Sequence, residues 1–150
     1  MSKVNGNLPD QYYTETYENN FGIFFLGNPS YLSNDTLCNF IYKDVTFSSV
    51  EQCIQYQKAL FFNYPETAAK IMTVDNTNIQ KQLTRKIKEY NTEIGRNAWD
   101  FQMNKILCDI LYCKFDQNPD LKSELLKTYP KRFYYCHPTD PVMGDRKSVV

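Results

Sequence analysis

Hydrophobic residues recur at intervals of three and four along most of the chain between Ser48 and Lys127, and this helical period is the strongest constraint on the fold. Pro65 and Pro119 divide the pattern, because proline is accepted in the first turn of a helix but not in its interior. The pattern therefore predicts helices over residues 48–62, 65–72, 78–88, 93–115 and 119–127.

The first of these helices begins with the sequence Ser48-Ser49-Val50-Glu51, which has the spacing of a capping box. In this motif the Ser48 side chain accepts from the amide of Glu51, and the Glu51 side chain accepts from the amide of Ser48. The longest helix, residues 93–115, is expected to turn one apolar face to the core. That face is predicted to consist of Ile94, Ala98, Trp99, Met103, Ile106, Leu107, Ile110 and Leu111.

Short aromatic and β-branched segments flank the helical region and predict a small sheet. Residues 21–26 read as one buried strand, residues 40–47 as two strands around a Lys43-Asp44 turn, and residues 133–136 as a last strand. The fold class we expect is α+β: a predominantly helical single domain with a small antiparallel sheet. Residues 1–20 are polar and are expected to form a loosely ordered leader to a domain over residues 21–150.

The charge balance excludes partners that are held by bulk electrostatics. Lysine plus arginine equals aspartate plus glutamate at 17 each, so no net charge favours a duplex nucleic acid or an anionic membrane. A local phosphate pocket needs only a few converging donors and stays open. The first thirty residues show no secretory signal, and the apolar runs are too short to span a bilayer.

Five cysteines form an odd set without a C-x-x-C pair, which suits a reducing cytoplasm. No second pair of ligands accompanies Cys136-His137 at zinc-like spacing, so we expect no metal. The sequence also has no glycine-rich phosphate loop and no G-x-S-x-G elbow, and His137 is its single histidine. The remaining chemistry lies in carboxylates near cations and aromatic rings.

A series of short motifs resembles the NADAR (YbiA-like) family along most of the chain. Members of this family typically contain L-S-N-F, then a spaced Phe, then Y-x-S-V-E-x-x-x-Q-x-x-K-A. The agreement runs in order from Phe24 to Gly144. The matching residues are Tyr31-Leu32-Ser33-Asn34, Phe40, Phe47-Ser48-Ser49-Val50-Glu51, Gln57-Lys58-Ala59, Arg85-Lys86, Trp99, Lys114-Phe115, Gln117-Asn118-Pro119, Leu121, Leu125-Leu126, Thr128, Asp140 and Gly144.

Three departures from the family pattern affect the expected site. Asp35 stands where the family usually has an aromatic residue after the Ser-Asn pair, and Met143 stands where the family has Trp in its D-x-x-W-G motif. Few residues follow Gly144, whereas many members carry a further W-x-G-x-N-x-L-G segment. One wall of the expected site is therefore altered.

The resemblance implies an N-glycosidase that acts on a ribose-phosphate or ADP-ribose compound. Glu51 and Asp140 are the expected catalytic carboxylates, since a carboxylate beside the sugar stabilises an oxocarbenium-like transition state. The substrate is either an aminopyrimidine ribose phosphate of riboflavin synthesis or an ADP-ribosyl group, including one attached to guanine in nucleic acid; we favour the second. No cofactor is implied. The expected substrate-binding residues are Asn34, Lys58, Arg85, Lys86, Trp99 and Gly144.

Each of these residues also has a simpler structural interpretation. Glu51 is the N3 residue of the predicted capping box, Asp140 suits a turn before Pro141, and a lone Trp such as Trp99 usually belongs to the core. Arg85 and Lys86 equally suit a solvated helix face, Asn34 a turn, and Gln117-Asn118 the cap of the next helix. Two other functions stay open: a module that binds ADP-ribose without cleaving it, and a helical interaction domain with no ligand.

Overall fold

A computed structural model describes residues 2–3, 8–13, 16–20, 22–25 and 30–135 of the chain. The chain forms two compact units, each described by itself below. We call Leu37–Gln117 the helical unit, and we call Met1–Thr36 together with Asn118–Val150 the sheet unit.

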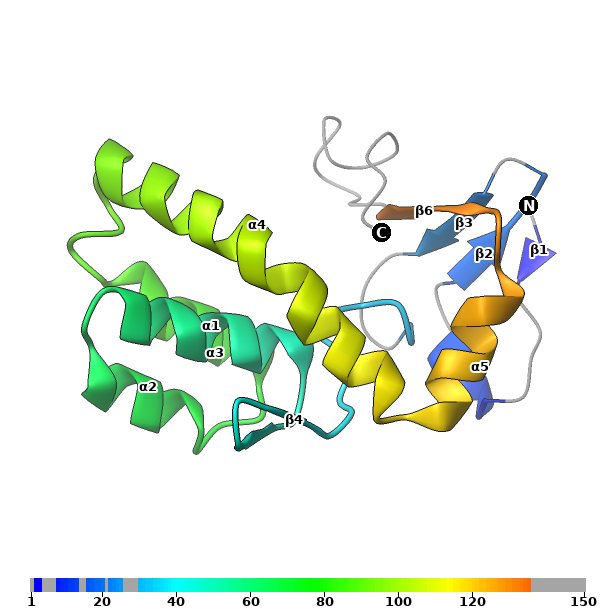
Figure 1. Cartoon of the computed structure of the whole chain (residues 1–150), viewed down its shortest axis with the longest axis horizontal. Helices are drawn as coiled ribbons and strands as arrows, with labels where there is room; N and C mark the ends of the chain where they lie inside the picture. Colours follow the sequence, from blue (N-terminus) through cyan, green and yellow to red (C-terminus); the bar gives the residue numbers. More distant parts are fainter. Residues whose placement is uncertain (1, 4–7, 14–15, 21, 26–29, 136–150) are drawn as a thin grey trace. The chain divides into compact units, whose positions relative to one another are not determined.

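The helical unit is organised around its first helix. In Figure 1, α1 lies between α4 and α2, with α3 behind it, and α1 packs against all three of these helices. A two-stranded antiparallel hairpin precedes α1, and its turn residues Lys43 and Asp44 both have positive φ, 48° and 65°. The elements of this unit are β4 (Phe40–Tyr42), β5 (Val45–Phe47), α1 (Val50–Phe61), α2 (Pro65–Ile71), α3 (Thr77–Arg85) and α4 (Glu93–Asp116).

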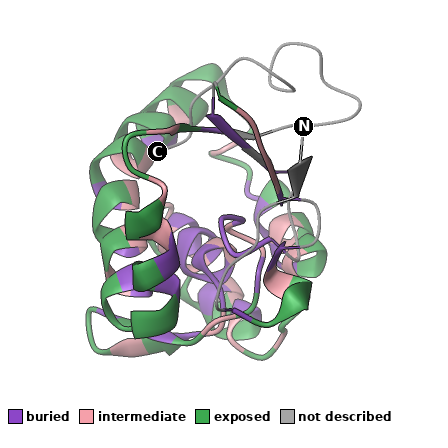
Figure 2. Cartoon of the chain, turned by 90° about the vertical axis from the view of Figure 1, so that its right-hand side faces the viewer, coloured by how far each residue is buried: buried purple, intermediate pink, exposed green. Residues whose placement is uncertain are grey.

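One hydrophobic cluster holds the hairpin, α1 and α4 together. In Figure 2 the helices carry buried residues on one side and exposed residues on the other. Phe40 and Phe47 face each other across the hairpin, with ring centroids 6.0 Å apart, and the Phe47 ring also meets Tyr56 of α1 edge-on. The buried members of the cluster are Phe40, Tyr42, Phe47, Val50, Cys53, Ile54, Trp99, Ile106 and Ile110.

The start of α1 differs by one residue from the prediction. Ser49, not Ser48, is the N-cap, and its hydroxyl accepts from the amide of Gln52 at 3.0 Å. The Gln52 side chain then accepts from the Ser48 amide at 2.8 Å, so Gln52 takes the place predicted for Glu51. The predicted capping box is therefore wrong by one residue. The buried Gln52 amide both accepts from Ser48 and donates to the carbonyls of Ile71 and Val74, and a carboxylate could not donate to them. Glu51 is consequently the second residue of α1, and Gln52 is the third.

The sheet unit contains a mixed sheet with the strand order β1-β2-β3-β6. The first three strands are antiparallel, whereas β6 pairs with β3 in parallel, with Phe133 opposite Ile23. The stretch predicted as a leader contains β1, η1 and β2. The elements of this unit are β1 (Ser2–Lys3), η1 (Asp10–Tyr13), β2 (Thr16–Glu18), β3 (Gly22–Phe25), α5 (Pro119–Lys127) and β6 (Arg132–Tyr135).

These elements confirm the α+β class with dominant helices and small sheets. The predicted inner face of α4 is wrong at its first turn, since Ile94 is 84% exposed and Ala98 is also exposed, whereas Trp99, Ile106 and Ile110 are buried. The predicted apolar stripe starts too early because the partners of α4 begin only near Trp99. In the described ranges, no helix combines the length and the apolar composition needed to cross a membrane.

The entry into α4 generates a stability prediction at Gly95. Its amide donates to the Thr92 hydroxyl at 2.9 Å, and a Cβ at this position would collide with the carbonyl group of Glu89. Gly95→Ala is expected to lower the free energy of unfolding by about 1–3 kcal/mol, although alanine favours helices, because the colliding atoms are backbone. Chemical denaturation measures this. Asn97→Ala, at an exposed position of the same turn, is the control and should change the free energy of unfolding by less than about 0.5 kcal/mol.

Candidate functional site

Three polar side chains lie on one face of α1, at positions 51, 55 and 58. The intervals of four and three residues bring Glu51, Gln55 and Lys58 onto one stripe of the helix. Glu51 is half-buried in the first turn, where the helix dipole favours a negative charge. Gln55 and Lys58 are 7% and 5% exposed, which is unusual for residues of their type. Burial of three polar groups in a row requires specific partners for each.

Hydrogen bonds join Glu51 to the neighbouring helix α3 through Gln55. The Gln55 amide nitrogen donates to Glu51 Oε1 at 2.7 Å. The Gln55 carbonyl oxygen accepts from the hydroxyl of Thr84 at 2.5 Å, and Thr84 is fully buried in α3. The Glu51 carboxylate is thus held from one side by a donor that is itself fixed by a second helix.

Lys58 lies against an aromatic ring and several charges. Its Nζ is 3.2 Å from the centroid of the Tyr90 ring, a close cation–π contact. Burial lowers the pKa of Lys58 to about 8, against the opposing effects of the Glu51 and Asp100 carboxylates, and the Arg85 cation lowers the pKa further. Near neutral pH the amine is therefore charged but readily gives up its proton.

The helices α1, α3 and α4 contribute to a single charged cluster. Glu51 and Lys58 come from α1, Arg85 from α3 and Asp100 from α4, and the other three each act electrostatically on Lys58. The structure thereby brings together three residues predicted for the site: Glu51, Lys58 and Arg85. It combines an ionisable carboxylate, a buried amine and an exposed guanidinium, the groups needed to stabilise opposite charges on a sugar phosphate.

The other predicted residues are placed differently. Lys86 is exposed at the C-cap of α3, next to Arg85 in sequence. Trp99 is 3% exposed in the hydrophobic cluster, with its ring 5.6 Å from that of Phe61, so its predicted role as a binding wall stays a prediction. Asn34 is half-buried in a turn of the sheet unit. Asp140 and Gly144 lie outside the described residues, as do Cys136, His137 and Met143.

Four residues of the cluster were missed in the sequence. Gln55 lies four residues after Glu51, where the family pattern E-x-x-x-Q has its glutamine, and this signal was available in the sequence. Thr84, Tyr90 and Asp100 come from α3, the following turn and α4, and only tertiary packing brings them to α1. In addition, Asn118 is at the N-cap of α5 without a side-chain cap bond, whereas Gln117 pairs with both backbone groups of Ile41, at 2.6 and 2.7 Å.

A second buried lysine, Lys114, lies near the end of α4. Burial lowers its pKa to about 8, and the side chain reaches the Phe115 ring at 5.1 Å. Lys114 in turn opposes the effect of burial, which raises the pKa of the Cys38 thiol. Among the described residues, no three His, Cys, Asp or Glu side chains come together in a way that could hold a metal ion.

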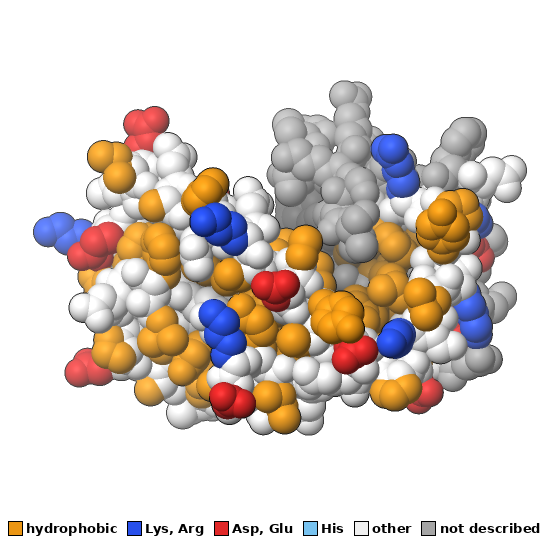
Figure 3. Space-filling model, viewed as in Figure 1, with side chains coloured by type: hydrophobic (Ala, Val, Ile, Leu, Met, Phe, Trp, Pro, Cys, Tyr) orange, Lys and Arg blue, Asp and Glu red, His pale blue; other side chains and the backbone are white. Residues whose placement is uncertain are grey.

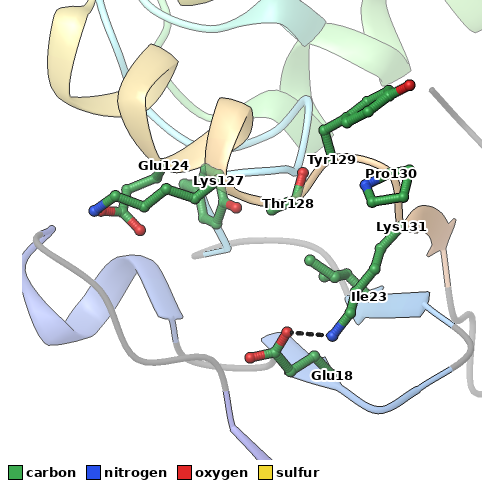
Figure 4. Close-up of a pocket in the computed structure, with 9 residues that line it drawn as sticks. Glu18, Ile23, Glu124, Lys127, Thr128, Tyr129, Pro130 and Lys131 are labelled. Carbon is green, nitrogen blue, oxygen red and sulfur yellow. Dashed lines mark hydrogen bonds and ion pairs between the residues drawn. The ribbon is translucent and has the colours of Figure 1, made fainter.

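The sheet unit contains a separate pocket of about 160 Å³. Figure 4 shows Glu18 and Lys131 facing each other across it, joined by an ion pair of 3.0 Å. On another wall Lys127 pairs with the buried Glu124 at 3.0 Å. None of the residues predicted for the site lines this pocket, and its carboxylates are matched by lysines. This pocket is therefore not the candidate functional site.

The surface in Figure 3 carries cationic and anionic side chains interspersed with hydrophobic ones. Arg85 and Lys86 are both exposed and follow one another at the end of α3. A phosphate group would be bound here by individual contacts.

Comparison with known proteins identifies the family. The NADAR domain model matches residues 12–148, nearly the entire chain, and the chain therefore belongs to the NADAR domain family. An N-glycosidase of Acanthamoeba polyphaga mimivirus is 33% identical over 98 residues, which are 65% of this chain and 55% of that protein. The Caenorhabditis elegans protein irg-1 is 26% identical over 102 residues, 68% of this chain and 47% of that protein. The chain spans about half the length of these curated relatives.

The lowered pKa of Lys58 predicts a pH-dependent stability difference. Between pH 8 and about 10.5 the unfolded chain binds a proton at Lys58 that the folded chain does not. The destabilisation caused by burying the charged amine is therefore complete below pH 8, decreases as the pH rises, and is absent above pH 10.5. Lys58→Met should therefore stabilise the protein relative to wild type at pH 7, and the difference should shrink by at most about 3 kcal/mol towards pH 10.5.

Denaturation of both proteins across this pH range checks the prediction, because all other titrating groups are shared. The exposed Lys70→Met, on α2, serves as the control and should give a small difference that does not change with pH. A constant offset for Lys58→Met would contradict the lowered pKa.

Proposed function

We propose that this chain is an N-glycosidase that hydrolyses the bond between a ribose carbon and a nitrogen base in a ribose-phosphate or ADP-ribose compound. The observation that carries the proposal is the charged cluster around Lys58, in which Glu51 is held by a partly buried hydrogen bond from Gln55. Membership of the NADAR family and similarity to a protein named as an N-glycosidase support it.

The chemistry of this cluster suits glycosidic cleavage. The bond between the sugar carbon and the base breaks with its electron pair on the nitrogen, and positive charge develops on the sugar ring. An ionised Glu51 beside the ring would stabilise that charge and orient the water whose oxygen attacks the carbon. The proton balance requires one proton on the departing base, and we propose Asp140 as the second carboxyl group of the reaction.

The remaining predicted residues are proposed to bind the substrate. Arg85 is exposed at the end of α3, with Lys86 beside it in sequence, and a guanidinium binds phosphate oxygens in pairs. Lys58 is nearly buried, so it would reach a phosphate only with its terminal amine. We retain Asn34, Trp99 and Gly144 as proposed contacts to the ribose and base. The proposed location is the cytoplasm, because the odd set of cysteines without a C-x-x-C pair suits a reducing compartment.

The substrate class we favour is an ADP-ribosyl group, including one attached to guanine in nucleic acid, over the aminopyrimidine ribose phosphates of riboflavin synthesis. Met143 replaces the family's tryptophan in the final motif. A site with a different side chain in its wall is expected to accept a substrate with a different base. The same substitution favours the second candidate function, a module that binds ADP-ribose without cleaving it.

Release of free base, measured by mass spectrometry, tests the activity. The substrates are the aminopyrimidine ribose phosphates, ADP-ribose, NAD and ADP-ribosylated guanosine. Wild type is expected to release base, and Glu51→Gln is expected to be slower by at least ~100-fold, because the neutral amide no longer stabilises positive charge. Glu66→Gln is a matched control, since Glu66 is also the second residue of its helix but is exposed on α2.

The outcomes separate the two candidate functions. Release by wild type and by Glu66→Gln, but not by Glu51→Gln, supports the glycosidase and selects the substrate. No release from any substrate, together with binding of ADP-ribose, would replace the enzyme by a binding module.

A further inference from the structure

The orientation of the Gln55 amide determines what it presents to Glu51. A glutamine amide accepts at one end and donates at the other, and reversing it exchanges the two. Here Thr84 Oγ1 is 2.5 Å from Gln55 Oε1, and Gln55 Nε2 is 2.7 Å from Glu51 Oε1. The hydroxyl of Thr84 thus occupies the acceptor end, which leaves the donor end for the carboxylate.

Burial makes this orientation costly to reverse. Thr84 is 0% and Gln55 7% exposed, so water cannot readily replace either partner. Among the described residues, the Thr84 hydroxyl also has the Lys81 carbonyl within reach as an acceptor, at 3.2 Å. If the amide were reversed, its oxygen would face an ionised Glu51, two acceptors in contact without a proton between them.

We propose that Thr84 and Gln55 are positioning residues that keep Glu51 in its ionised form and fix the direction of its carboxylate. This inference rests on the proposed N-glycosidase function and specifies the role of Glu51 within it. Glu51 then stabilises the positive sugar and orients water, and it does not supply the proton that the departing base requires. That proton comes from another group.

Other charged groups act on Lys58 alongside Glu51 and must be considered in any pH effect. Lys58 on α1 favours the ionised form of Glu51, while Arg85 on α3 and Asp100 on α4 act on the same cluster with opposite signs. None of these side chains is altered by a substitution at Thr84. A change at Thr84 that affects the pH dependence therefore acts through Gln55.

The experiment compares Thr84→Val and Thr84→Ser. Valine has nearly the shape of threonine but no hydroxyl, whereas serine keeps the donor. For Thr84→Val we expect kcat/KM to fall about tenfold and the acidic limb of the pH–rate profile to move up by about half to one pH unit, because the carboxylate loses its oriented donor. Thr84→Ser should remain close to wild type in both.

Thr73→Val controls for the loss of a threonine hydroxyl that makes a local hydrogen bond. Thr73 donates to the carbonyl three residues earlier, as Thr84 can, but it is exposed after α2. It should leave the pH–rate profile unchanged. Thermal unfolding of all three variants identifies any that fail to fold, and Gln55→Leu then provides a second test, with the same upward shift of the acidic limb expected.

The result distinguishes the two levels of the proposal. If wild type releases base, Glu51→Gln does not, and Thr84→Val has the pH profile of Thr84→Ser, the positioning role is overturned while the N-glycosidase stands. If wild type releases no base from any substrate, the proposed function fails and the positioning role fails with it. A shifted acidic limb in Thr84→Val and in Gln55→Leu, with Thr84→Ser unchanged, supports both.

Discussion

The side chain of Gln52 connects the start of α1 to the end of α2, and the geometry of the helical unit depends on it. Its carbonyl oxygen accepts from the amide and the hydroxyl of Ser48, at 2.8 and 3.0 Å, while its amide nitrogen donates to the carbonyls of Ile71 and Val74, both at 3.3 Å. A buried amide with all its partners present specifies one arrangement, because any slip leaves unsatisfied polar groups. The rotation of α1 about its axis follows from this clamp.

That rotation decides which side chains of α1 reach the site. Successive residues lie about 100° apart around a helix, so fixing Gln52 against the end of α2 also fixes the directions of its neighbours. With Ser49 as the cap, Gln52 points to α2, and the stripe of Glu51, Gln55 and Lys58 runs alongside α3 and α4. Ser49 and Gln52, which cap and clamp the helix, therefore also position the candidate site. The structural role belongs to Gln52 and the proposed chemical role to the adjacent Glu51.

Local patterns predicted the elements well where local chemistry decides them. Both ends of α5 agree with the prediction, because Pro119 begins the helix, and the hairpin turn falls on Lys43-Asp44 as predicted. The start of α1 was missed because two adjacent serines can each cap a helix, and the choice depends on Gln52 reaching α2. The parallel pairing of β3 with β6 joins residues more than a hundred positions apart and has no local signal. The exposure of Ile94 also has no local signal, because the apolar pattern of α4 alone would place this residue in the core.

The site shows the same division between local and tertiary information. Glu51 and Lys58 could be proposed from the sequence because both fall on positions of the family motif, and Gln55 lies between them on the same helix. Thr84, Tyr90 and Asp100 could not, since each contributes through packing against α1. These three are the residues that alter the chemistry of the first set: Thr84 orients the donor to Glu51, the Tyr90 ring covers the Lys58 amine, and Asp100 opposes the loss of its proton. A buried lysine and a buried glutamine destabilise a fold unless such partners compensate. Because hydrophobic side chains at these positions would stabilise α1 more simply, the retention of a polar stripe with matched partners is itself an argument that the stripe has a chemical role.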